Sequence, residues 1–190
     1  MNRTLLVLAM FCSASTFAQS PVINKADIDD SGSQYQGNLT VNQAAGDQQQ
    51  QANARAIAIG HGASATTQIR QALGTPSSPL MDATSSIGGN SFSNGNGALG
   101  VNQSAGAGTQ QANALRISVS AQPQTIDDSV LLQQNVALIN NSDPTVSATG
   151  YRQVSTSDQA FTGSRGVIQL NQSAGVGNRM GNTLSIRVAD

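Results

Sequence analysis

The chain has 190 residues, with nine Lys or Arg, ten acidic residues and a formal net charge of −1. So few basic residues exclude the clustered positive charge with which proteins bind nucleic acid. Aromatic residues make up 3% of the chain and Trp is absent, so a conventional globular core is not expected. Gln, Asn, Ser, Ala and Gly are abundant instead, which favours either disorder or β-assembly.

Residues 1–18 have the features of a secretory signal peptide. Arg3 supplies the positive start, residues 5–11 form a short apolar run, and residues 16–18 offer a cleavage site before Gln19. The run is far shorter than the roughly 20 residues of a membrane span. We therefore expect an exported mature chain that has lost Cys12, its only cysteine.

After a polar segment at residues 19–36, one phrase of 23 residues occurs three times, at 37–59, 97–119 and 166–188. The third repeat and the C-terminus together cover 166–190. Aligned without gaps, the copies share seven identical columns, which in the first copy are Gly37, Asn42, Gln43, Ala45, Gly46, Asn53 and Ile57. Repetition at a fixed length is typical of stacked architectures.

Residues 60–96 and 120–165 separate the repeats, contain Gly, Ser, Thr and Pro, and are expected to be flexible linkers. One part of the second linker, residues 126–139, is more apolar. Its alternation suits a strand, whereas Asp127 or Asp128 could cap a short helix. We expect this segment to pack against the repeats.

Within each repeat, apolar residues alternate on either side of a glycine. Period two predicts strands with one buried face, and glycine allows the sharp reversal between them. The predicted bend glycines are Gly46, Gly106 and Gly175. The predicted rung core is Leu39, Val41, Ile57, Ile59, Leu99, Val101, Ile117, Val119, Ile168, Leu170, Ile186 and Val188.

The two strands of a repeat can pair as a hairpin, or face each other through their side chains as an arch. The repeated Asn-Gln step favours the arch, because identical amide side chains about 4.8 Å apart can hydrogen-bond along a ladder. The predicted ladder residues are Asn42, Gln43, Asn53, Asn102, Gln103, Asn113, Asn171, Gln172 and Asn182.

The repeats lack both Pro and Lys, the residues that commonly block pairing at an exposed strand edge. One repeat buries too little apolar surface to offset the entropy of ordering it. The sequence therefore predicts an all-β fold of three stacked strand–bend–strand rungs, a β-solenoid or cross-β, amyloid-like stack joined by long flexible linkers. Open edges at its ends would template further strands, so we expect self-association into fibres.

Catalytic groups are scarce. His61 is the only histidine, and no nucleophile–base pair can be assembled from the spacing of the residues. Asp27 to Gly32 resembles the start of a calcium loop, but its twelfth position is Asn38 rather than Glu. We therefore expect no enzyme, small-molecule substrate, metal or cofactor.

Two motifs carry a resemblance to a known family. They are Val-Asn-Gln-Ser-Ala-Gly, starting at Val101, and Gln-Gln-Ala-Asn-Ala, starting at Gln110. The chain resembles the Fap functional-amyloid subunits of Pseudomonas and relatives. The third copy departs from the pattern, with Arg179, Met180 and Gly181 replacing the Gln-Gln-Ala step.

The resemblance implies a secreted fibre subunit in biofilm matrix at the cell surface. The implied partners are a major amyloid subunit, an outer-membrane export pore and a periplasmic chaperone. The spacers are shorter than those of the family's major subunit and no Cys-x-x-Cys motif is present, so the chain is most similar to the minor, nucleating subunit. The alternatives are a curli-type or major amyloid subunit, and a β-solenoid adhesin that does not polymerise.

Overall fold

The computed structural model describes residues 22–73, 80–121 and 150–189, and this part of the chain contains nine strands and no helix. Accordingly, these residues include no helix that is long and apolar enough to span a bilayer. The signal-peptide residues 1–18 and the segment 126–139 lie outside the described residues. The predicted all-β, stacked architecture is confirmed.

The strands form three parallel sheets, and each sheet takes one strand from each third of the chain. The first sheet contains β1 (Val22–Asp29), β4 (Met81–Gly88) and β7 (Arg152–Thr156). The second contains β2 (Gln36–Ala45), β5 (Asn96–Ala107) and β8 (Arg165–Val176). The third contains β3 (Gln50–Ile59), β6 (Gln110–Ser120) and β9 (Arg179–Ala189).

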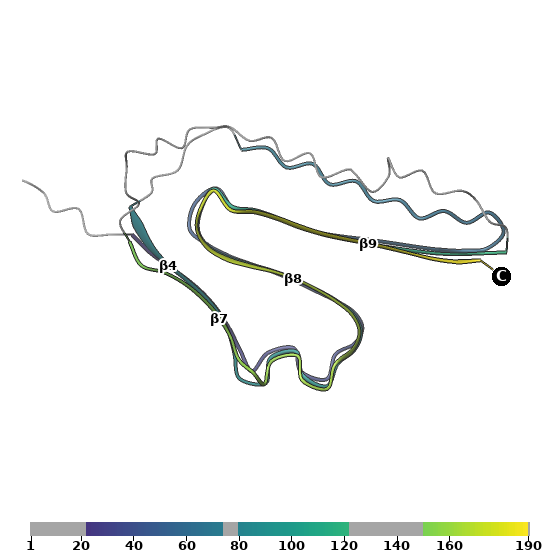
Figure 1. Ribbon diagram of the computed structural model, residues 1–190, viewed down its shortest axis with the longest axis horizontal. Helices are drawn as coiled ribbons and strands as arrows, with labels where there is room; N and C mark the ends of the chain where they lie inside the picture. Colours follow the sequence, from purple (N-terminus) through teal and green to yellow (C-terminus); the bar gives the residue numbers. More distant parts are fainter. Residues whose placement is uncertain (1–21, 74–79, 122–149, 190) are drawn as a thin grey trace, which may run out of the picture.

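Consecutive strands therefore form three layers, which we call rung 1 (β1–β3), rung 2 (β4–β6) and rung 3 (β7–β9). Viewed down the stacking direction, the three rungs follow almost the same winding path (Figure 1). The register matches the gap-free alignment of the repeats: Asn42 pairs with Asn102, which pairs with Asn171. In the third sheet, Asn53, Asn113 and Asn182 align in the same way.

The two strands of each repeat are joined as an arch. β2 and β3 lie in different sheets, and each pairs in parallel with its counterpart in rung 2. The side chains of β2 and β3 meet across the arch, while the backbone N–H and C=O groups point along the stack. Of the two closures that the sequence allows, the structure has the one favoured by the repeated Asn-Gln step.

Each rung also contains a strand outside the repeat. β1 lies in the polar segment 19–36, and β4 and β7 lie in the segments expected to be linkers. Their inward faces mix polar, small and large apolar residues, which obscured these strands in the sequence: β1 buries Asn24, Ala26 and Ile28, and β4 buries Met81, Ala83, Ser85 and Ile87. The rung is therefore strand–turn–strand–bend–strand, with β1, β4 and β7 covering the outer face of the second sheet.

The main apolar core lies between the first and second sheets. Its buried members are Ile28, Tyr35, Ile87, Phe92, Leu99 and Val101. Leu39, Val41, Leu170, Ala160 and Phe161 pack against them. The rings of Phe92 and Phe161, from the turns of rungs 2 and 3, stack with centroids 5.4 Å apart.

The prediction of the rung core was wrong for four of its twelve residues, which are exposed: Ile57, Ile59, Ile168 and Val188. Ile57 and Ile59 are 64% and 77% exposed because the third sheet extends past the end of the second, so no sheet faces them (Figure 1). Ile168 is exposed because rung 3 is covered on one side only, whereas its counterpart Leu99 in rung 2 is 0% exposed. Val188 is exposed for both reasons, because it lies past the end of the second sheet and belongs to rung 3.

Candidate assembly interface

Two asparagine ladders line the inside of the arch. On the second sheet, Asn102 Nδ2 donates to Asn42 Oδ1 at 2.9 Å, and Asn171 Nδ2 donates to Asn102 Oδ1 at 2.9 Å. On the third sheet, the amide of Asn113 donates to Asn53 Oδ1 and that of Asn182 to Asn113 Oδ1, both at 3.0 Å. Each ladder joins all three rungs.

Hydrogen bonds across the arch join the two ladders to each other. Asn53 donates to Asn42 at 2.7 Å, and Asn113 donates to Asn102 at 3.0 Å. Asn113 Nδ2 also lies 3.1 Å from the carbonyl oxygen of Val101. Asn102 and Asn113 are almost fully buried, so these bonds provide the partners that buried amides require.

A glutamine ladder occupies the opposite face of the second sheet. Gln103 Nε2 donates to Gln43 Oε1 at 2.8 Å, and Gln172 Nε2 donates to Gln103 Oε1 at 2.9 Å. The same amides reach the first sheet, where Gln43 donates to the carbonyl of Asp27 at 2.8 Å and Gln103 to that of Ser86 at 2.8 Å. This ladder therefore joins neighbouring rungs and also joins two sheets.

The bend glycines stack directly on one another. Gly46, Gly106 and Gly175 have φ of 107°, 122° and 121°, in the region that side chains disfavour. A Cβ on Gly46 would lie 1.9 Å from the carbonyl oxygen of Gly106, and a Cβ on Gly106 would lie 1.9 Å from that of Gly175. Both the turn and the close approach of the rungs therefore require glycine.

Comparison with known proteins agrees with this architecture. The model of the functional amyloid protein FapB/FapC family matches residues 12–189. The chain belongs to this family. The resemblance inferred from the repeat motifs is thereby confirmed.

A relative from Pseudomonas aeruginosa, functional amyloid subunit FapC, is 35% identical over 105 residues. The match covers 52% of this chain and 31% of FapC, so it spans about a third of that relative. No solved structure matched the chain. In the described residues of this family member, no group of three or more His, Cys, Asp or Glu is placed to hold a metal ion.

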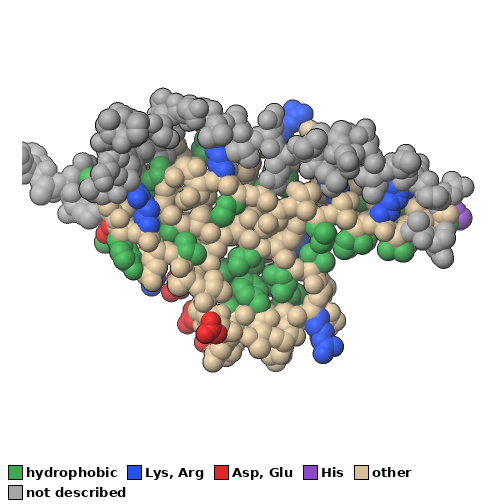
Figure 2. Space-filling view, viewed as in Figure 1, with side chains coloured by type: hydrophobic (Ala, Val, Ile, Leu, Met, Phe, Trp, Pro, Cys, Tyr) green, Lys and Arg blue, Asp and Glu red, His purple; other side chains and the backbone are tan. Residues whose placement is uncertain are grey.

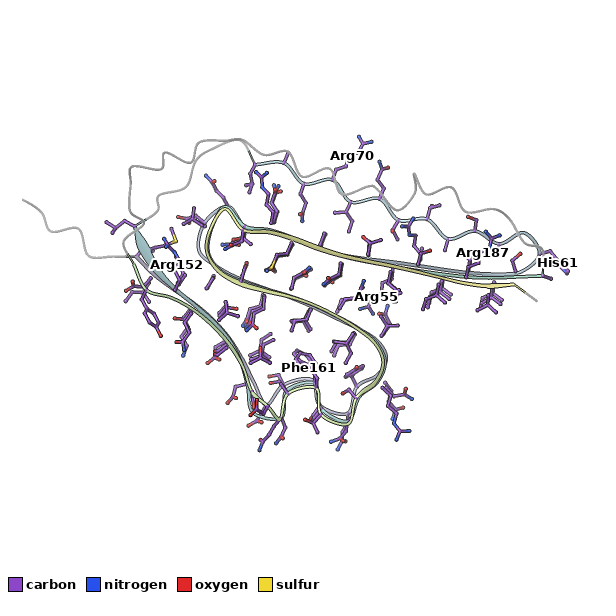
Figure 3. All side chains as sticks on the ribbon, viewed as in Figure 1. Arg55, His61, Arg70, Arg152, Phe161 and Arg187 are labelled. Carbon is purple, nitrogen blue, oxygen red and sulfur yellow. The ribbon has the colours of Figure 1, made fainter. Side chains whose placement is uncertain are left out.

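Sequence reasoning missed one charged side chain inside the arch. Arg55 Nη1 donates to the carbonyl of Ala98 at 2.6 Å, and its Nη2 donates to that of Leu39 at 3.0 Å. Burial lowers the pKa of Arg55 from its usual value, although the guanidinium remains charged. Gly100 makes room for it, since a Cβ there would lie 2.7 Å from Arg55 Nη2. Figure 3 shows Arg55 pointing into the arch. Arg55 lies two residues after Asn53 in the same strand, so both side chains face the same side of the sheet. This spacing could have predicted that Arg55 points into the arch.

Two further amide pairs escaped the sequence analysis because the third repeat lacks them. Gln110 donates to Gln50 at 3.0 Å, and Gln51 donates to Gln111 at 3.0 Å. Rung 3 carries Arg179 and Met180 at these positions. Columns of identical amides therefore extend through all three rungs only where the repeats are identical.

The three complete ladders share one direction. In each of them, the amide nitrogen of the later rung donates to the amide oxygen of the rung before it. The Gln51–Gln111 pair runs the opposite way. The complete ladders thus give the stack two different ends, with donor groups oriented toward the outside of rung 1 and acceptor groups toward the outside of rung 3.

Proposed function

We propose that this chain polymerises into extracellular cross-β fibres by head-to-tail, in-register stacking of whole subunits. The observation that carries the proposal is the match between the two ends of the stack. Rung 1 ends in Asn42, Gln43 and Asn53, and rung 3 ends in the same residue types at the same positions of the register. A second copy placed on rung 3 would continue all three ladders in their existing direction.

The backbone supports the same arrangement. Rungs 1 and 3 are the edge layers of three parallel sheets, and such edges have backbone groups available for another strand. The repeat portions of these layers contain no Pro, and the only Lys on an edge strand is Lys25 in β1. Each added copy would therefore extend three sheets at once.

Apolar burial favours stacking as well. Leu99 of rung 2, the middle layer, is 0% exposed, whereas its counterpart Ile168 in rung 3 is 39% exposed. Figure 2, which views the molecule along the stacking direction, shows hydrophobic side chains uncovered in the middle of this face. Burying a fully exposed aliphatic side chain contributes roughly 1.5–3 kcal/mol, and covering the exposed part of Ile168 contributes a corresponding fraction. Stacking would give the terminal aliphatic residues the environment that Leu99 already has.

Fibre diffraction and sedimentation of the purified mature chain test the proposal. We expect thioflavin-binding fibres with a meridional reflection near 4.7–4.8 Å. A chain that remains a stable monomer in ultracentrifugation would contradict polymerisation and would favour a non-polymerising adhesin.

We further infer a minor, nucleating role, which rests on the short spacers and the resemblance described above. Substoichiometric addition of this chain should then shorten the lag phase of the family's major subunit. An unchanged lag phase, measured alongside addition of preformed major-subunit seeds as the positive control, would argue against nucleation.

The proposed route to the cell surface is a signal peptide at residues 1–18, a periplasmic chaperone and an outer-membrane pore. N-terminal sequencing of the extracellular protein should begin at Gln19. Periplasmic accumulation in cells lacking the pore would support the route, and undiminished surface fibres would contradict it.

A further inference from the structure

The bends of the two terminal rungs carry opposite charges. Asp47 lies in the bend of rung 1, and its carbonyl accepts a hydrogen bond from Gly108 at 3.0 Å. The carbonyl of Ala107 in rung 2 makes the equivalent bond with Gly177 at 2.9 Å, so Asp47 and Ala107 occupy the same column. In rung 3 this column contains Val176. The acid is therefore present only at the rung 1 end.

At the rung 3 end, the bend carries basic residues instead. Arg179 begins β9 and occupies the column of Gln50 and Gln110, three positions after the column of Asp47. A second arginine lies close by: Arg152 Cδ is 2.9 Å from where a Cβ on Gly175 would be. Figure 3 shows Arg152 beside the bend. Both arginines belong to rung 3.

The charges of the strands and their turns, counted together, show the same asymmetry. Rung 1 carries four Asp against Lys25 and Arg55, whereas rung 3 carries four Arg against Asp158. Rung 2 carries only Asp82 and Arg116. The described ends of the stack therefore differ in sign, while its middle layer is balanced.

We propose that the acidic bend of rung 1 docks on the basic bend of rung 3 of a second copy, where Asp47 stacks on Val176 and Arg179, three positions along the same bend, reaches toward the Asp47 carboxylate. This inference rests on the proposed fibre function. Layers of a parallel sheet are about 4.8 Å apart, a separation that an arginine side chain readily bridges. Like ends would bring like charges together, so the bend pair selects head-to-tail contact and accelerates it by electrostatic attraction.

Charge reversal with complementation tests the pair. Asp47→Arg places arginine at both positions 47 and 179, and Arg179→Asp places aspartate at both, so each variant alone has like charges at this pair of positions in every junction between its own copies. An equimolar mixture restores opposite charges at every junction when the two variants alternate. The measurement is the elongation rate from preformed wild-type seeds, followed by thioflavin fluorescence at low salt.

We expect each single variant to elongate roughly three- to tenfold more slowly than the wild type, and the mixture to recover to within about twofold. The differences should shrink near 1 M salt, where the Debye length is about 3 Å. Asp158→Arg makes the same charge change on an exposed turn of the basic rung 3, where it removes an acid, so it should not slow elongation.

Single variants that elongate at the wild-type rate, a mixture no faster than the slower variant, or an equal slowing by Asp158→Arg would each overturn the pairing. Those results leave the proposed fibre function intact, because wild-type chains still elongate wild-type seeds in the same experiment. If wild-type chains do not elongate wild-type seeds, both the proposed fibre function and this inference are overturned.

Discussion

Asn113 faces Asn102 across the arch of rung 2 and donates a hydrogen bond to its Oδ1 at 3.0 Å. Each of the two residues also bonds to its counterparts in the rungs above and below. One pair of side chains therefore closes the arch and joins three layers.

Replacing Asn102 with Ala should destabilise the stack by about 1–3 kcal/mol, because the amides of Asn113 and Asn171 lose a buried acceptor. The measurement is the denaturant midpoint of fibre dissociation. Asn38→Ala, at an exposed position of the same sheet, is the matched control and should change the midpoint little. Equal effects of the two substitutions would contradict the ladder account.

Gly106→Ala should prevent stacking, because its Cβ would collide with the carbonyl of Gly175 at 1.9 Å. Gly177→Ala is the control: Gly177 also has positive φ, at 69°, but a Cβ there meets nothing within 4 Å. It should cost only the conformational term of about 1–2 kcal/mol. Seeded fibre growth separates the two, and similar growth by both variants would show that close stacking is not what selects glycine at the bend.

Leu99→Ala should lower stability by about 2–5 kcal/mol, because Leu99 is fully buried in the middle rung. Ile57→Ala removes a comparable side chain from an exposed site and should change stability by about 0.5 kcal/mol or less. Denaturant titration of the two variants checks whether the apolar core lies between the first and second sheets. A larger loss for Ile57→Ala would contradict both this placement of the core and the exposure of Ile57.

Acid should weaken the contact between rungs 1 and 2. Ser86 donates a hydrogen bond to Asp27, and this bond lowers the pKa of Asp27 below its usual value of 3.8. Because the folded-state pKa is depressed, the stabilisation is present above about pH 4 and is lost as the pH falls through the folded-state value. Ser86→Ala should therefore show a smaller loss of stability on acidification below about pH 4. An unchanged pH profile would rule out this contribution.

The repeats could be recognised from the sequence because all three copies carry the same residue wherever the stacked structure needs the same side chain in every rung. Asn42, Gln43 and Gly46 recur in every copy, and their gap-free alignment is the observed register. β1, β4 and β7 could not be found in this way, because their columns mix residue types, as with Asn24, Ala83 and Arg152. What these strands share is their position in the stack, which emerges only once the layers are aligned.

The burial of the aliphatic residues depends on geometry that alternation does not encode. Leu39 and Ile57 both alternate within their strands, yet Leu39 packs on the core and Ile57 faces solvent. The difference arises from the length of the sheet opposite each of them. Arg55 was missed for the converse reason, since a charged side chain on the inner face is satisfied by carbonyl groups of two rungs.

The axial rise per subunit of a fibre, determined by electron cryomicroscopy, tests the central claim most directly. Head-to-tail stacking of three-layered subunits predicts a rise of about 14 Å, three layers of about 4.8 Å, with Asn171 of one copy beside Asn42 of the next. A rise of about 4.8 Å per subunit, with each chain lying flat in a single layer, would contradict it.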